Sequence, residues 1–501
     1  MTKIPLQDRF RSRCSHRLNR IQRFVRLTRN PQWHDTTTLG LSRSANRELF
    51  DGKNPHQSVS SVCDRIAAVK YVTAILLLVT SMFAAAQQPS GLGTEVDRRV
   101  REIESKAISW RRDIHQNPEL SNRELRTASL VADHLRKLGM EVRTEVAHTG
   151  VIGVLRGRQP GPVVALRADM DALPVVEQTG LPFASKVKTN YAGQEVGVTH
   201  ACGHDAHTAI LMAAAEVLAG MKDRFNGTVK FIFQPAEEGA PAGEQGGAKL
   251  MIAEGALENP KPAAVFALHT MASISTGSIA YKPNGAMASA DVLQIVVKGR
   301  ATHGAMPWSG VDPIVVSSQI IMALQTITSR QIDPTTAPAV VTIGSIHGGV
   351  RNNMIPDEVQ MLGTIRTLDP KVQQDIHERI RKLVSGIAES AGATGTTTIT
   401  PSTPVTFNDP QLMDRMLPTV RRVVGDRSVV GVPASTIAED FAFYQQQVPG
   451  MYIFLGVTPV GKDTATAPAN HSPLFTVDEA ALSVGIRTLA NLALDFLSLE
   501  K

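Results

Sequence analysis

The chain has 501 residues, of which 43% are hydrophobic and 20% are charged, a composition typical of a globular protein rather than a disordered one. This length favours more than one domain. The formal charge of +6 belongs to the N-terminus, because residues 1–86 carry 14 Lys and Arg against 5 Asp and Glu, which leaves 38 against 41 (−3) for the other 415 residues. The body of the chain therefore gives no electrostatic argument for binding nucleic acid.

Residues 1–68 are rich in arginine and lack sustained apolar periodicity, so we expect a disordered basic extension there. An apolar run, Tyr71–Phe83, then leads to Ala84-Ala85-Ala86, which is the pattern of a secretory signal peptide over residues 69–86. Because signal peptides begin at the N-terminus, we expect translation to start at position 69, which would make residues 1–68 a gene-start artefact.

The predicted location is secreted or periplasmic. The apolar run is shorter than the roughly 20 residues that a transmembrane helix needs, so we expect no stable membrane span after cleavage. The alternative is a membrane anchor formed by residues 71–86.

Residues 95–283 are predicted to form the first part of an α/β domain. Apolar residues at helical spacing predict a helix over 96–115, and a second helix is expected between Asn122 and Leu138. Strands are expected at 141–147, 151–156 and 163–167. Asp169 and Asp171 follow the last of these strands, and side chains two residues apart on a strand point the same way, into the crevice where α/β proteins keep their sites.

The segment Thr199–His207 holds three histidines, one cysteine and one aspartate within nine residues. It precedes an Ala-rich helix predicted over 206–221, so the cluster lies on a short turn that enters this helix. Imidazole and thiolate are ligands of borderline-soft divalent metals. Cys202 is the only cysteine after Cys63, so it lacks a disulfide partner in the body of the chain, which points to metal ligation or nucleophilic attack.

Acidic and imidazole groups follow the next two predicted strands as well. Strand 228–234 leads to Glu237 and Glu238, and we expect these adjacent carboxylates on an extended segment to face opposite ways, one toward a metal and one toward a bound water. Strand 263–268 is predicted to end at His269. Such groups at the ends of three successive strands predict one common site.

From about residue 284 the predicted order becomes strand, helix, strand, strand, helix, strand, which indicates a ferredoxin-like (βαββαβ) domain over residues 284–402. The first domain resumes over 403–501, with a helix predicted at 439–447 and a histidine, His471, in the loop before the last helix. The predicted fold class is α/β, with an αβα catalytic domain and an inserted ferredoxin-like domain.

These motifs, in this order, resemble those of the M20 metallopeptidase superfamily, and above all its amidohydrolase branch of hippurate hydrolases, N-acyl-amino-acid hydrolases and auxin-conjugate hydrolases. The resemblance covers about residues 97–498, and its motifs are weak singly but strong in combination. They are Arg111–Leu120, Arg167–Pro174, Thr199–His207, Gln234–Gly239, Asn353–Pro356, Glu439–Phe441 and His471–Pro473.

The resemblance implies a metal-binding catalytic domain and a lid that also forms a homodimer. It implies two divalent metal ions per subunit, Mn²⁺ or Zn²⁺ in the first place and Ni²⁺ or Co²⁺ as alternatives. By motif position the metal ligands are Cys202, His204, Glu238, His269 and His471.

The same resemblance assigns roles to three further residues, and ligand chemistry suggests a fourth. Glu237 is the catalytic carboxylate, His303 of the lid reaches a neighbouring active site to hold the scissile carbonyl oxygen, and Asn353 contacts the substrate. Asp171 is the candidate for orienting a ligand imidazole. One departure is Ala301-Thr302-His303, where many relatives have two glycines before the histidine.

The expected function is a metal-dependent amidohydrolase that cleaves N-acyl (acetyl, benzoyl or similar) amino acids, with a metal-activated water and Glu237 as general base. A metallo-carboxypeptidase or dipeptidase of the same superfamily is the alternative. A thiol amidase with Cys202 as nucleophile would be sensitive to alkylation and indifferent to chelators. A non-catalytic periplasmic metal-binding protein would keep the ligands but would not need Glu237.

Overall fold

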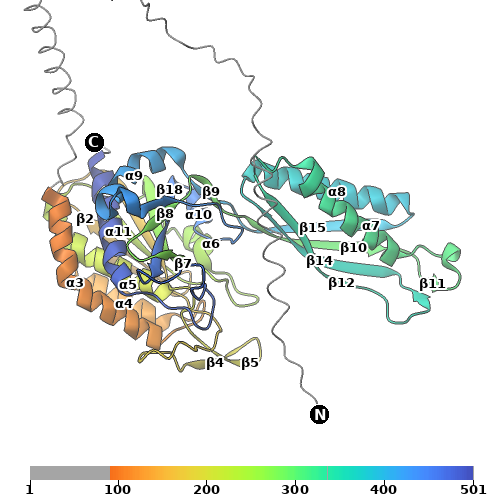
Figure 1. Ribbon diagram of the computed structural model, residues 1–501, viewed down its shortest axis with the longest axis horizontal. Coiled ribbons are helices and arrows are strands. Elements are labelled where there is room, and N and C mark those ends of the chain that lie inside the picture. Colours follow the sequence, from red (N-terminus) through yellow and green to blue (C-terminus); the bar gives the residue numbers. More distant parts are fainter. Residues whose placement is uncertain (1–90, 336, 500–501) are drawn as a thin grey trace, which may run out of the picture. The chain divides into compact units, whose positions relative to one another are not determined.

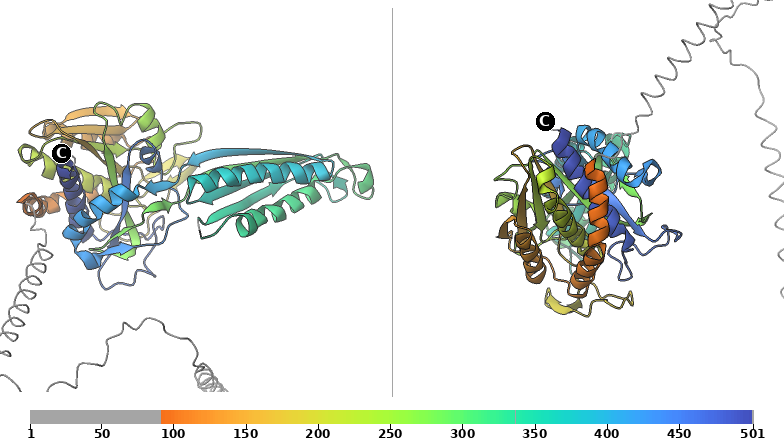
Figure 2. Two further views of the ribbon diagram at one scale, coloured as in Figure 1. Left: turned by 90° about the horizontal axis from the view of Figure 1, so that it is seen from above. Right: turned by 90° about the vertical axis from the view of Figure 1, so that its left-hand side faces the viewer.

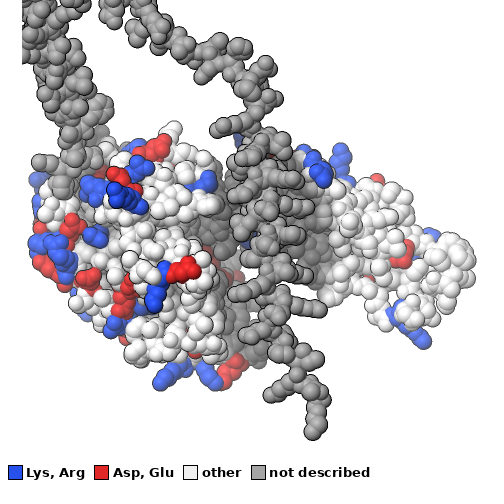
Figure 3. Space-filling view, in the orientation of Figure 1, with Lys and Arg blue, Asp and Glu red and all other residues white. Residues whose placement is uncertain are grey.

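The computed structural model describes residues 91–335 and 337–499 (Figure 1). The expected basic extension and signal peptide lie outside the described residues. Among these residues one helix, Ala480–Leu499, is long and apolar enough to cross a membrane, but 78% of its apolar window is buried inside the protein, as in a core helix. Figure 3 shows acidic and basic side chains interspersed on the visible face of the catalytic domain rather than gathered into one basic surface.

The catalytic domain is built on an eight-stranded sheet in the order β1-β2-β6-β3-β7-β18-β8-β17. Its centre, β6-β3-β7-β18, is parallel. Strands β6 and β18 are buried along their whole length, as expected for central strands covered on both faces. The strands are β1 Glu141–Val146, β2 Gly150–Arg156, β3 Val163–Asp169, β6 Thr228–Gln234, β7 Ala264–Ser275, β8 Ile279–Tyr281, β17 Val429–Gly431 and β18 Gly450–Thr458.

Helices cover both faces of this sheet (Figures 1 and 2). One face packs against α3 Gly91–Gln116, α4 Leu125–Lys137, α5 His204–Ala219, α9 Pro410–Val424 and α11 Ala480–Leu499. The other face packs against α6 Gly247–Ala253 and α10 Ala442–Gln445. The predicted αβα arrangement is therefore confirmed. A hairpin that the sequence did not predict, β4 Lys188–Tyr191 with β5 Gln194–Gly197, lies apart from the main sheet.

The inserted lid has an antiparallel sheet in the order β12-β14-β10-β15. Helices α7 and α8 pack on one face of it and enclose a separate apolar core (Figure 1). Its elements are β10 Ala290–Lys298, α7 Pro313–Thr326, β12 Ala339–His347, β14 Glu358–Thr367, α8 Pro370–Ser390 and β15 Thr394–Thr403. This is the expected βαββαβ order. The small pairs β9 Asn284–Met287 with β16 Thr406–Asn408, and β11 Thr302–His303 with β13 Met354–Ile355, complete the strands.

Two local expectations are wrong. Strand β7 does not end at His269 but continues to Ser275, because it pairs with β18, where Phe454 lies opposite His269. The helix expected over 439–447 is limited to α10, Ala442–Gln445, because Glu439 and Asp440 are engaged in side-chain contacts near the site.

Candidate metal centre and active site

The Cys202–His204 turn owes its shape to Gly203. This residue has φ +98°, a left-handed conformation that favours glycine, and it precedes the first residue of α5. A Cβ atom on Gly203 would lie 2.1 Å from Thr270 Oγ1, so the turn packs directly against β7. The glycine thus lets Cys202 and His204 approach the strand that carries His269.

The structure brings the five predicted ligands together. Cys202 Sγ lies 3.3 Å from His269 Nε2, and His471 Nε2 lies 3.2 Å from Glu238 Oε1. Ligand atoms of two overlapping groups lie within 4.8 Å of one another, Cys202 with His204 and His269, and Cys202 with Glu238 and His471. One thiol, three imidazoles and one carboxylate therefore form two adjoining groups that share Cys202.

One polar atom of this cluster, His204 Nε2, is buried without a hydrogen-bond partner among the described residues. It lies 3.9 Å from Glu238 Oε1. Buried polar atoms almost always have partners, and this one points into a group of metal-binding side chains. The donor set fits divalent cations of borderline softness.

Asp171 orients His204. The ring Nδ1–H of His204 donates to the main-chain oxygen of Asp171 at 2.8 Å and lies 3.3 Å from its Oδ1, which leaves Nε2 directed into the cluster. Ser121 in turn donates its hydroxyl to Asp171 Oδ2 at 2.8 Å. The structure thus places Asp171 where the sequence predicted an orienting carboxylate.

The two adjacent glutamates do not face opposite ways, which corrects the expectation from an extended segment. Ala236 has φ +54°, and the chain turns at Glu237 and Glu238. Both carboxylates consequently approach His204 Nε2, at 4.0 Å for Glu237 and 3.9 Å for Glu238.

Two buried carboxylates hold this turn. Glu124 accepts the backbone N–H of Ala236 at 2.9 Å, and Asp171 accepts those of Glu237 and Glu238 at 3.1 and 3.0 Å. Three successive backbone N–H groups therefore donate hydrogen bonds to the side-chain carboxyl groups of Glu124 and Asp171. The sequence did not identify Glu124 as part of the site.

Burial changes the acid–base behaviour of the site. It raises the pKa of Glu237 well above the usual range, and the nearby carboxylates Glu439 and Glu238 add to the effect. Burial also raises the pKa of the Cys202 thiol. A thiol with a raised pKa is a poor nucleophile without further activation, which counts against the thiol amidase.

A network behind the cluster contains a fully buried arginine that the sequence analysis did not single out as functional. Arg167 pairs with Asp169 at 2.6 Å and with Glu439 and Asp440 at 3.0 Å each. Asp169 also contacts the ring of His207. This network holds Glu439 close to Glu237, with which it forms a group of carboxyl oxygens within 4.8 Å.

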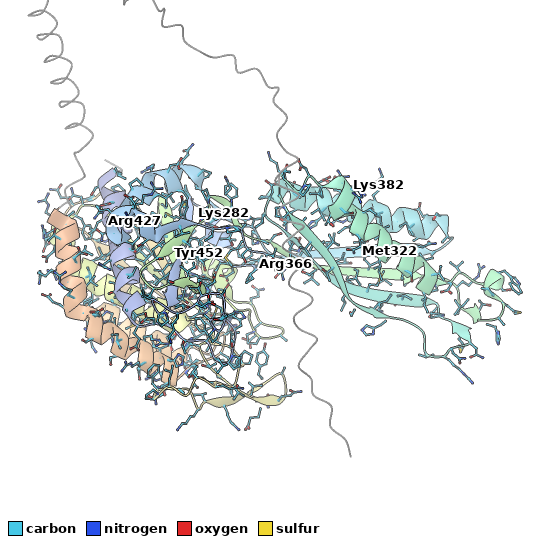
Figure 4. All side chains as sticks on the ribbon, viewed as in Figure 1. Lys282, Met322, Arg366, Lys382, Arg427 and Tyr452 are labelled. Atoms are coloured by element: carbon cyan, nitrogen blue, oxygen red, sulfur yellow. The ribbon has the colours of Figure 1, made fainter. Side chains whose placement is uncertain are left out.

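The cluster opens into a pocket of about 460 Å³ that also receives lid residues. Arg366, near the end of β14, lines this pocket together with Cys202, Glu237 and His471. Figure 4 labels Arg366. Among the lining residues that the structure describes, Arg366 is the only lysine or arginine, and its guanidinium has no ion-pair partner there. Sequence reasoning missed Arg366.

His303 and Asn353 do not line the pocket. They lie together beyond the other end of β10, where His303 pairs with Met354 and the Gly304 N–H donates to Asn353 O at 2.8 Å. Ala290, the first residue of β10, lines the pocket, and the nine residues of β10 span about 30 Å. His303 is exposed and cannot reach the pocket of its own chain.

The fold is that of a two-domain protein with an α/β domain, an inserted lid and a cluster of metal-binding side chains. The family model described as Peptidase family M20/M25/M40 matches residues 165–495, and the chain belongs to this family. It is a hydrolase acting on amide bonds, and the non-catalytic alternative is wrong.

This chain matches similar proteins over nearly their whole length. Thermostable carboxypeptidase 2 of Saccharolobus solfataricus is 44% identical over 402 residues, 79% of this chain and 97% of the relative. N-acetylcysteine deacetylase of Bacillus subtilis is 37% identical over 390 residues, 78% and 96% of the two chains. The solved structure of the Bacillus subtilis YXEP protein, described as a dinuclear metal binding peptidase from the M20 family, is 35% identical, with 79% and 99% coverage and a TM-score of 0.66.

Proposed function

We propose that the protein is a metal-dependent amidohydrolase that cleaves the amide bond of N-acyl amino acids. The observation that carries the proposal is the convergence of Cys202, His204, Glu238, His269 and His471 beside Glu237. The N-acetylcysteine deacetylase among the relatives supports an N-acyl amino acid as the substrate class.

Two divalent cations, Mn²⁺ or Zn²⁺ in the first place, would be held by the five donors. The buried His204 Nε2, which has no hydrogen-bond partner among the described residues, supports this assignment, as does the description of the similar YXEP protein as dinuclear. Bound cations would supply Lewis-acid chemistry and lower the pKa of water toward about 7.

Glu237 serves as the general base and acid. Its carboxylate lies beside the cluster without binding a described side chain by a hydrogen bond, so it is available to a water molecule. It takes a proton from the attacking water and passes it to the nitrogen of the leaving amine. Such proton transfer contributes about 10²–10⁴-fold to a rate.

Arg366 recognises the carboxylate of the substrate. An N-acyl amino acid keeps its free α-carboxylate, and a guanidinium pairs with a carboxylate through two parallel hydrogen bonds. Because Arg366 is the only lysine or arginine among the described lining residues, the pocket favours one anionic group at this place.

A carboxypeptidase is the second candidate, because its substrates carry the same free carboxylate and because a relative 44% identical is named a carboxypeptidase. The two activities differ in the group on the other side of the amide. An amidohydrolase accepts a simple acyl group there, whereas a carboxypeptidase needs a peptide.

The lid would form a homodimer. It exposes several large apolar side chains, among them Trp308 and Val350 at 78% and 94% exposure. Since His303 cannot reach its own pocket, it would contact the scissile carbonyl in the partner subunit, and Asn353 beside it would contact the substrate there. Sedimentation of the purified protein tests this, and a stable active monomer would contradict it.

The deciding experiment is a substrate panel of N-acetyl, N-benzoyl and indole-acetyl amino acids and of dipeptides. Each is assayed after chelation and after return of Mn²⁺ or Zn²⁺. We expect N-acyl amino acids to be cleaved fastest, with activity lost on chelation and restored by metal. Faster cleavage of peptides would assign a carboxypeptidase, and activity indifferent to chelators would contradict the metal mechanism.

We also propose secretion, which N-terminal sequencing of the exported protein tests.

A further inference from the structure

A second cavity adjoins the metal cluster. It has a volume of about 620 Å³ and shares Glu238 with the pocket that Arg366 lines, but none of that pocket's other residues. Its walls are the chain between α3 and α4, the segment after Asp171, the β4–β5 hairpin and the loop that follows Glu238. We call it the hairpin cavity, and Glu238 lies between it and the pocket.

Four of the polar side chains on its walls are already engaged. Glu119 accepts the backbone N–H groups of Arg126 and Thr127 at 2.9 Å each, and Ser121 donates to Asp171. At the rim, Lys188 pairs with Glu195 at 3.0 Å, and Arg123 pairs with Glu244. A ligand in the cavity therefore finds few unused polar partners.

Apolar side chains supply the remaining walls. The cavity is lined by Leu120, Leu173, Pro174, Val187, Tyr191 and Val198. Tyr191, on the hairpin, is 44% exposed, and its hydroxyl forms no hydrogen bond with a described residue. A large aromatic ring left open to solvent beside a cavity is suited to contact an apolar ligand.

We propose that the hairpin cavity binds the acyl group of the substrate and selects bulky apolar acyl or aryl groups over acetyl. The inference rests on the proposed function, in which Arg366 holds the α-carboxylate in the pocket on one side of Glu238. From the scissile amide, the acyl group extends in the opposite direction and enters the hairpin cavity on the other side of Glu238. A volume of about 620 Å³ falls within the roughly 300–1,000 Å³ of sites for drug-sized ligands, and an acetyl group would leave most of it unfilled.

The test is a series of N-acyl derivatives of one amino acid, from acetyl through hexanoyl to octanoyl, with benzoyl as the aryl member. Burying a methylene group contributes a factor of about four to binding, so kcat/KM of the native enzyme should rise along the series. In Tyr191→Ala the ratio of kcat/KM for octanoyl to that for acetyl should fall about tenfold, because an apolar wall is lost. Ala242→Trp, an exposed lining position, fills the cavity and should lower the same ratio.

The matched control is Gln194→Ala. Gln194 is exposed, pairs with Tyr191 across the hairpin and does not line the cavity. The ratio of kcat/KM for octanoyl to that for acetyl in this variant should therefore equal that of the native enzyme. Equal ratios in all four proteins would overturn the assignment of the cavity while leaving the proposed function intact. If the native enzyme cleaves no N-acyl amino acid, the proposed function fails, and the acyl assignment fails with it.

Discussion

The backbone N–H of Glu238 donates a hydrogen bond to Asp171 Oδ2 at 3.0 Å. The other oxygen of Asp171 accepts the Glu237 N–H at 3.1 Å and lies 3.3 Å from the ring nitrogen of His204. One fully buried carboxylate thus holds the glutamate turn and the orientation of a ligand imidazole together.

Replacing Asp171 should weaken metal binding. Loss of a partner that orients a metal ligand typically costs about 10–100-fold in affinity, so we expect Asp171→Ala to bind Mn²⁺ or Zn²⁺ at least tenfold more weakly in a competition titration with a chelating dye. Ser121→Ala removes only one donor to Asp171 and serves as the control with a smaller effect. An unchanged affinity in a folded Asp171→Ala protein would show that Asp171 does not orient the site.

Glu237→Gln separates proton transfer from metal binding. The amide keeps the shape of the side chain but cannot accept the proton, so kcat should fall by about 10²–10⁴-fold. Metal content, measured by elemental analysis, should stay at the native value. Turnover that survives this substitution would exclude Glu237 as the general base.

Arg366→Ala should act on substrate binding. Loss of the guanidinium removes a charge-assisted contact, so kcat/KM for an N-acyl amino acid should fall by roughly tenfold or more. The same substrate with its carboxylate converted to an amide provides the control, because its kcat/KM should be low in both proteins and little changed by the substitution. Equal losses for the two substrates would mean that Arg366 does not recognise the carboxylate.

His115 should make stability depend on pH. Burial alone would lower the pKa of His115, but Asp205, at 2.9 Å from Nδ1, and Glu177 outweigh burial and raise it to about 9. A raised pKa means that the stabilisation is complete below the unfolded value of about 6.5 and is lost as pH rises through about 9.

The expected contribution of this group is roughly 3 kcal/mol, because one pKa unit corresponds to about 1.4 kcal/mol. Urea unfolding of the native protein and of His115→Gln at a series of pH values from 6 to 9.5 would measure it. The difference in unfolding free energy between the two should shrink as pH rises. A difference independent of pH would contradict the ion pairing.

The sequence predicted the site best where potential ligand residues come soon after the ends of strands. Asp171 and Glu238 come soon after parallel strands that lie side by side, so their meeting at one edge of the sheet could be expected from chain order alone. The lid followed from its element order in the same way.

The rest depends on contacts between distant segments. The left-handed turn at Ala236 is held by Glu124, more than a hundred residues earlier, so no local pattern predicted that both glutamates face the site. Strand β7 continues past His269 because β18 pairs with it, and Arg366 reaches the pocket only because the lid strand returns to the catalytic domain.

The central claim is that five side chains hold two cations beside Glu237. Anomalous diffraction from crystals grown with Mn²⁺ tests it most directly. The account predicts two peaks about 3.5–4 Å apart, within bonding distance of Cys202, His204, Glu238, His269 and His471. Peaks elsewhere in the protein, or a single peak that leaves any of these five without a metal contact, would contradict it.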